Sequence, residues 1–69
     1  MNRQPVTSSN IASIGYDAVL QILEVEFLNG TLYHYLNVPQ PEYDALMAAG
    51  SHGTYLNANI KPRYQFQKQ

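Results

Sequence analysis

The chain has 69 residues, no cysteine and a formal net charge of −1. It is long enough for one small domain, and without cysteine it can form neither a disulfide nor a thiolate metal site. The chain therefore lacks the excess of basic residues that most nucleic-acid-binding domains carry. The polar start has no apolar signal-peptide core, and no apolar run reaches the about 20 residues that span a bilayer. We therefore expect a cytoplasmic protein that does not enter membranes.

The first elements are predicted from residues 1–27. Residues 1–9 show no periodicity, so we expect a flexible N-terminal tail before a single domain at residues 10–67. Ile11 and Ile14 are three apart, which fits a strand only with a bulge at Ser13 or Gly15. The following segment, VLQILEVEF, alternates apolar and charged residues and predicts a strand with one apolar face.

A hairpin is expected next, because Asn29-Gly30 is a strong turn signal before TLYHYLNV. Two registers are open. A two-residue loop would place Tyr33 and Tyr35 on the charged, outer face of the sheet. A three-residue loop with Gly30 as a bulge would turn both tyrosines into the core and pair His34 with Glu24 outside. We favour the second register, because a large aromatic ring with its hydroxyl at the rim suits a thin core.

Helical spacing follows the hairpin. Two prolines open a segment in which Tyr43, Leu46 and Met47 share one helix face, and Gly50 marks its end. Ser51 can cap a second, shorter helix. We thus predict an α+β fold, a small antiparallel β-meander of three strands packed against one or two short C-terminal helices, with residues 63–67 as a possible fourth, edge strand. The expected shared core comprises Leu23, Val25, Phe27, Leu46 and Met47.

Three motifs in a fixed order resemble those of a known family. They are Tyr33-His34-Tyr35, Ser51-His52-Gly53-Thr54-Tyr55 and Asn57-Ala58-Asn59-Ile60-Lys61. Over residues 8–66 the chain is similar to the KTSC domain, a short bacterial and phage-associated module that occurs alone and at the C-terminus of some lysyl-tRNA synthetases. The synthetase context implies RNA binding, whereas the net charge of this chain argues against it.

Catalytic signals are missing from the sequence. It contains no Gly-x-Ser-x-Gly elbow, no phosphate-cradling glycine loop and no local zinc-ligand spacing. We therefore expect a non-catalytic binding module without a cofactor or metal.

Two classes of partner are open. RNA or another single-stranded nucleic acid would stack on tyrosines and contact the C-terminal cations Lys61, Arg63 and Lys68. Alternatively, the chain is a protein-interaction module that attaches its sheet edge or a helix face to a larger partner, or forms a homo-oligomer. The tyrosines would then fill the core or the interface, and the cations would only aid solubility. The candidate ligand-binding residues are Tyr33, His34, Tyr35, Ser51, His52, Asn57, Lys61 and Arg63.

Overall fold

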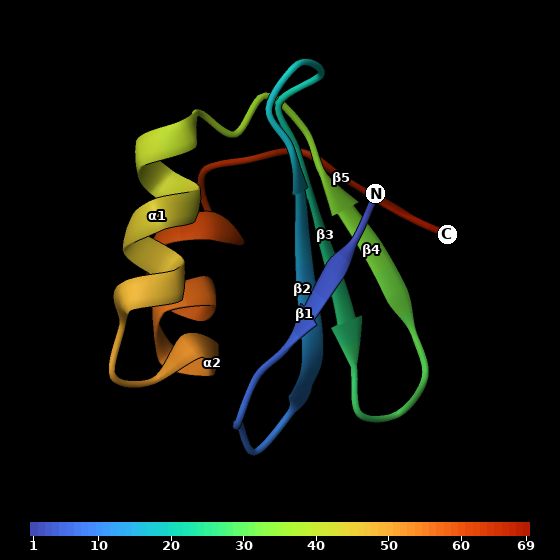
Figure 1. Ribbon diagram of the computed structural model, residues 1–69, viewed down its shortest axis with the longest axis vertical. Coiled ribbons are helices and arrows are strands. Elements are labelled where there is room, and N and C mark those ends of the chain that lie inside the picture. Colours follow the sequence, from blue (N-terminus) through green and yellow to red (C-terminus); the bar gives the residue numbers. More distant parts are fainter.

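The computed structural model describes all of residues 1–69 and consists of a five-stranded antiparallel sheet with a helical layer on one face (Figure 1). The strands are ordered β1-β2-β3-β4-β5. The elements are β1 (Arg3–Pro5), β2 (Ile11–Asp17), β3 (Ile22–Phe27), β4 (Leu32–Tyr35), α1 (Gln40–Ala48), α2 (His52–Tyr55), the π-helical turn η1 (Leu56–Ile60) and β5 (Phe66–Lys68). The predicted α+β class is confirmed, with five strands instead of three or four.

Strand β1 lies within the segment that we expected to be a tail without regular structure. It pairs antiparallel with β2 and places Arg3 opposite Gly15. The two strands approach closely there, since a Cβ on Gly15 would lie 2.8 Å from the backbone oxygen of Asn2. Backbone pairing with β2 holds this strand, and the lack of a side chain at Gly15 lets the two strands approach. Neither feature produces an apolar pattern in the sequence.

A bulge lets β2 place both of its isoleucines in the core. The register with β3 shifts between Ile11 and Ser13, so the extra residue is Ala12 and not Ser13 or Gly15 as expected. Ile11 and Ile14 are both fully buried. The predicted bulge is thus present, but at the residue before Ser13.

The hairpin between β3 and β4 has the three-residue loop 28–30. The backbone N–H of Phe27 donates to the oxygen of Thr31, and the N–H of Gly30 donates to the oxygen of Phe27, both at 2.9 Å. Gly30 has a φ of 89°, the left-handed conformation that this loop requires. The favoured register is therefore confirmed, and both tyrosines of β4 lie on the core face.

The helical layer begins with α1 directly after Pro39 and continues through α2 into η1. In α1, Leu46 is buried. The helix ends in extended backbone at Ala49 (φ −68°, ψ 145°), so Gly50 does not form the left-handed helix end that the sequence suggested. Ser51 caps α2 as predicted, because its hydroxyl accepts from the N–H of Thr54 at 3.2 Å.

The core lies between this helical layer and the sheet. Of the five residues predicted to share the core, Leu23, Val25 and Leu46 are fully buried. The other two, Phe27 and Met47, are partly buried and pack at its margin. The last strand begins at Phe66, so the edge strand expected over residues 63–67 is displaced towards the C-terminus. The nine buried core residues are Ile11, Ile14, Leu23, Val25, Tyr35, Val38, Leu46, Leu56 and Ile60.

Candidate functional site

Tyr35 is a core residue. Its side chain is only 1% exposed, and β4 pairs it with Leu23 of β3. Burial, with a smaller contribution from the neighbouring Tyr33, raises the pKa of the Tyr35 hydroxyl to about 12. Of the two tyrosines named as candidate ligand-binding residues, Tyr35 therefore belongs to the core, as the favoured register predicts.

Tyr33 belongs to a cluster of three rings that is partly open to solvent, which we call the aromatic platform: Phe27, Tyr33 and Phe66. The ring of Tyr33 stacks on Phe66 with centroids 5.4 Å apart and planes 12° apart. It meets Phe27 edge-on at 5.6 Å and 81°. Phe66 is 55% exposed, so part of this ring is open to a ligand.

Two lysines border the aromatic platform. The Nζ atom of Lys61 lies 5.4 Å from the ring centroid of Phe27, a cation–π contact. Lys68 pairs directly with Tyr33 across β4 and β5, so their side chains project from the same face of the sheet. Lys61, Tyr33 and Phe27 also line one surface hollow. The fold thus brings aromatic faces and cations together, as single-strand binders require.

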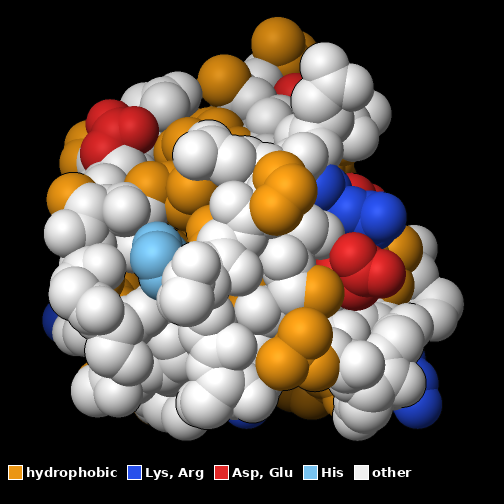
Figure 2. Space-filling model, turned by 60° about the horizontal axis from the view of Figure 1, so that its bottom comes forward, with side chains coloured by type: hydrophobic (Ala, Val, Ile, Leu, Met, Phe, Trp, Pro, Cys, Tyr) orange, Lys and Arg blue, Asp and Glu red, His pale blue; other side chains and the backbone are white.

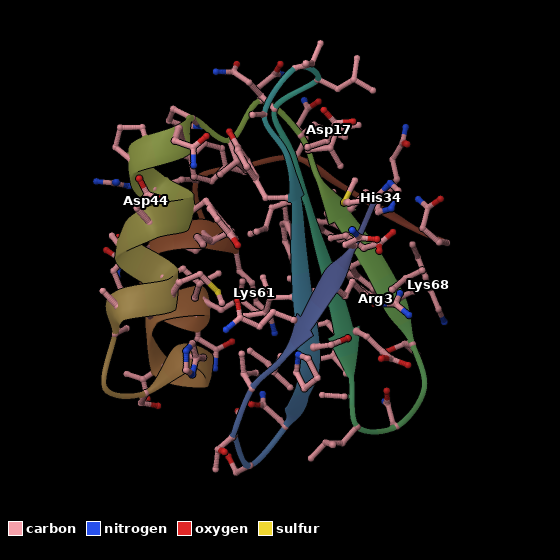
Figure 3. The ribbon with its side chains drawn as sticks, viewed as in Figure 1. Arg3, Asp17, His34, Asp44, Lys61 and Lys68 are labelled. Atoms are coloured by element: carbon pink, nitrogen blue, oxygen red, sulfur yellow. The ribbon has the colours of Figure 1, made fainter.

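His34 does not reach the aromatic platform. It points to the opposite side of the sheet, where Figure 3 shows it with Arg3, away from Lys61. Its Nε2 atom lies 2.7 Å from a carboxylate oxygen of Glu24, and Arg3 approaches the other oxygen at 3.3 Å. The pairing of His34 with Glu24 outside the core is confirmed, and it makes His34 part of a separate polar face.

Three other candidates lie on the helical layer. Ser51 is occupied as the helix cap. His52 is half-buried, and its Nδ1 atom is buried without a hydrogen-bond partner. Asn57 is exposed on η1. None of these three residues lines a hollow with Tyr33 or Lys61.

Arg63 is drawn towards a partly buried carboxylate. It lies 3.8 Å from Glu42, whose side chain is only 12% exposed. Glu42 also accepts hydrogen bonds from the hydroxyls of Tyr55 at 2.6 Å and Tyr64 at 3.1 Å. The hydrogen bond to Glu42 is the main cause of the raised pKa of Tyr55. Burial is the main cause of the raised pKa of Tyr64, followed by its own hydrogen bond to Glu42. Arg63 therefore supports the attachment of the C-terminal segment to α1.

Phe27 and Phe66 were not among the candidate binding residues that the sequence suggested. Phe27 was assigned to the core because it continues the apolar stripe of β3. Phe66 was recognised only as part of an edge strand. The register between β4 and β5, which sets Phe66 opposite Tyr35, follows from how the helical layer returns the chain to the sheet. No local pattern predicts that return.

Charges are dispersed over the surface that Figure 2 shows. On this face, which includes the end at the bottom of Figure 1, Lys and Arg side chains occupy separate places, and one of them lies next to an acidic side chain. No three His, Cys, Asp or Glu side chains gather as a metal site would need. No helix has the length and apolar character to cross a bilayer.

Comparisons with known proteins define the class. The model of the KTSC domain family matches residues 7–64, so the chain belongs to the KTSC domain family. It is 45% identical over 62 residues to a protein of Tsukamurella paurometabola, covering 90% of this chain and 92% of the relative. It is also 45% identical over 64 residues to an uncharacterized protein of Stutzerimonas stutzeri, covering 93% and 90%.

A solved structure confirms the architecture. The crystal structure of a KTSC domain protein from Yersinia pestis is 40% identical to this chain and superposes with a TM-score of 0.93. The match covers 99% of this chain and 96% of the other. The resemblance found in the three sequence motifs is thereby confirmed, and β1 and β5 are within the matched length.

Proposed function

We propose that this KTSC domain is a non-catalytic module that binds single-stranded RNA on the aromatic platform. The observation that supports this proposal is the stacked pair Tyr33 and Phe66, with Phe66 more than half exposed. Bases stack on such rings without strong sequence preference, and each stack contributes about 1–3 kcal/mol. Lys61 and Lys68 border the rings and would contact the phosphates.

The net charge of −1 limits the electrostatic contribution. Two lysines can make only about two phosphate contacts, so binding is expected to be weak, with a shallow salt dependence. Most of the affinity must then come from stacking. This distinguishes the proposed binding from that of basic domains, in which phosphate contacts dominate.

Fluorescence anisotropy with a short single-stranded RNA tests the proposal. Phe66→Leu is expected to weaken binding by about tenfold, equivalent to about 1.4 kcal/mol, while the fold is retained because the side chain is largely exposed. Tyr43→Leu is the matched control, since Tyr43 stacks on Tyr16 away from the platform. If both variants bind like the parent, the platform is not the RNA site.

A second candidate function is protein binding at the free edge of β5. This strand pairs only with β4. Since Gln65 and Gln69 bond to β4, antiparallel alternation directs the backbone groups of Phe66 and Lys68 outward. A partner strand or a second copy of the chain would add to this edge. Sedimentation of the protein alone tests for self-association, and replacing Lys68 with proline would remove one of the outward N–H groups and block it at the edge.

A further inference from the structure

Two adjoining hollows lie beside the aromatic platform. The larger has a volume of about 390 Å³ and lies between the residues before β2 and the hairpin loop 28–30. The backbone N–H of Leu28 donates to the oxygen of Asn10 at 2.9 Å and ties these two segments together. The lining residues are Ser9, Asn10, Phe27, Leu28, Asn29 and Lys61.

Both asparagines of the larger hollow have engaged oxygens. The Oδ1 atom of Asn10 accepts from the Ser8 hydroxyl at 3.1 Å. The Oδ1 atom of Asn29 accepts from the backbone N–H of Thr31 at 3.1 Å and from its hydroxyl at 2.7 Å. The NH₂ group of each amide makes no hydrogen bond within the chain, so each side chain keeps free donors.

The ammonium group of Lys61 is the one charge among the lining residues, and no carboxylate lines either hollow. The acidic residues of β3 are engaged on the opposite face of the sheet, where Glu24 pairs with His34 and Glu26 accepts from the hydroxyl of Ser13 at 2.9 Å. A hollow with two amide donors and one cation suits an oxyanion.

The smaller hollow, of about 200 Å³, shares Phe27, Asn29 and Lys61 with the larger one and adds Thr31 and Tyr33. It therefore offers an aromatic wall next to the group of donors. An aromatic wall beside an oxyanion site matches a nucleotide, which joins a planar base to a phosphate.

We infer that the larger hollow binds the phosphate group of a nucleotide whose base lies in the smaller hollow beside Tyr33. This inference rests on the proposed function and specifies its ligand. A terminal phosphate and an internal phosphate of an RNA strand share this chemistry, and the experiment separates them.

The first arm uses NMR titrations with uridine, uridine 5′-monophosphate and inorganic phosphate. The monophosphate is expected to bind about tenfold more tightly than uridine, with the largest shifts at the amides of residues 28–31 and 10. Inorganic phosphate is expected to shift the same amides. Equal affinity for uridine and its monophosphate would overturn the inference.

The second arm uses Asn29→Asp. Aspartate keeps the oxygen that accepts from Thr31 and suits the turn before Gly30, but it replaces the donor with a negative charge. The monophosphate is expected to bind this variant no better than uridine does. Asn37→Asp is the matched control, because Asn37 is exposed between β4 and α1 and lines neither hollow. An unchanged preference for the monophosphate in Asn29→Asp would contradict the assignment.

The third arm compares RNA oligonucleotides with a 5′-hydroxyl, a 5′-phosphate or a 3′-phosphate. If one phosphorylated oligonucleotide binds more tightly than the others, the larger hollow holds a terminal phosphate. If all three bind equally and each binds Asn29→Asp more weakly, the hollow holds an internal phosphate. RNA binding that depends on Phe66 but not on Asn29 would overturn this inference and leave the proposed function standing. If RNA does not bind while the monophosphate does so through Asn29, the proposed function fails and the phosphate site remains.

Discussion

The rings of Tyr33 and Phe66 stack with their centroids 5.4 Å apart, although the whole helical layer separates their strands in the chain. The contact is diagonal across the sheet, because Tyr33 pairs with Lys68 while Phe66 pairs with Tyr35. The aromatic platform therefore exists only when β5 is attached to β4. Any ligand of the platform stabilises that attachment, since it binds the folded edge and not the detached one.

The two tyrosines of β4 are expected to respond differently to the same replacement. Tyr35→Leu should lower the free energy of unfolding by about 1–3 kcal/mol, because the ring is buried and leucine leaves part of its volume unfilled. Tyr33→Leu should cost less than about 1 kcal/mol, because the ring is half-buried, and should weaken RNA binding. Urea unfolding and anisotropy measure the two effects. Equal losses of stability would contradict these assignments.

The salt dependence of RNA binding should identify the cations that bind phosphate. Replacing both Lys61 and Lys68 with glutamine is expected to reduce the slope of log K against log salt by about 0.7 for each phosphate that is no longer neutralised. Arg3→Gln removes the same charge on the opposite face, where Arg3 pairs with Glu24, and should leave the slope unchanged. A slope that responds equally to Arg3→Gln would mean that binding senses only net charge.

Much of the fold was predictable because it depends on periodicity and turn chemistry. The alternation in β3, the Asn29-Gly30 turn and the cap at Ser51 are local signals, and the structure contains all three elements. Strand β1 was missed because its residues are polar and exposed, so only its partner strand reveals it. The site was predicted in part: Tyr33 and Lys61 come together, whereas His34 faces away from them.

Strand β1 should detach when Gly15 gains a side chain. A Cβ at this position would lie 2.8 Å from the backbone oxygen of Asn2 and 3.0 Å from Cγ of Arg3, so the backbone of β1 must move. Gly15→Ala is expected to remove the hydrogen-exchange protection of the Gln4 and Val6 amides, which face β2, and to lower the free energy of unfolding by about 1–3 kcal/mol. Gly50→Ala is the control, because a Cβ there meets no atom within 4 Å. Retained protection of β1 in Gly15→Ala would show that the strand tolerates the side chain.

Alkaline pH should destabilise the protein partly through Tyr35. Its pKa is raised from 10.0 to about 12 by burial and by Tyr33. The folded state therefore retains the proton over a pH range in which the unfolded chain loses it, and the contribution of this group to stability is complete below pH 10 and decreases as the pH rises towards 12. Tyr55 and Tyr64, whose pKa values are also raised, act in the same direction.

Tyr35→Phe isolates this contribution. Phenylalanine keeps the buried ring and removes the titrating hydroxyl, which makes no hydrogen bond within the chain, so the variant should match the parent closely at pH 8. Between pH 10 and pH 12, the free energy of unfolding should decrease less steeply in the variant than in the parent, because other groups titrate equally in both. Urea unfolding of both proteins at half-unit pH intervals measures the difference. Parallel curves over this interval would show that the Tyr35 hydroxyl titrates alike in the folded and unfolded states.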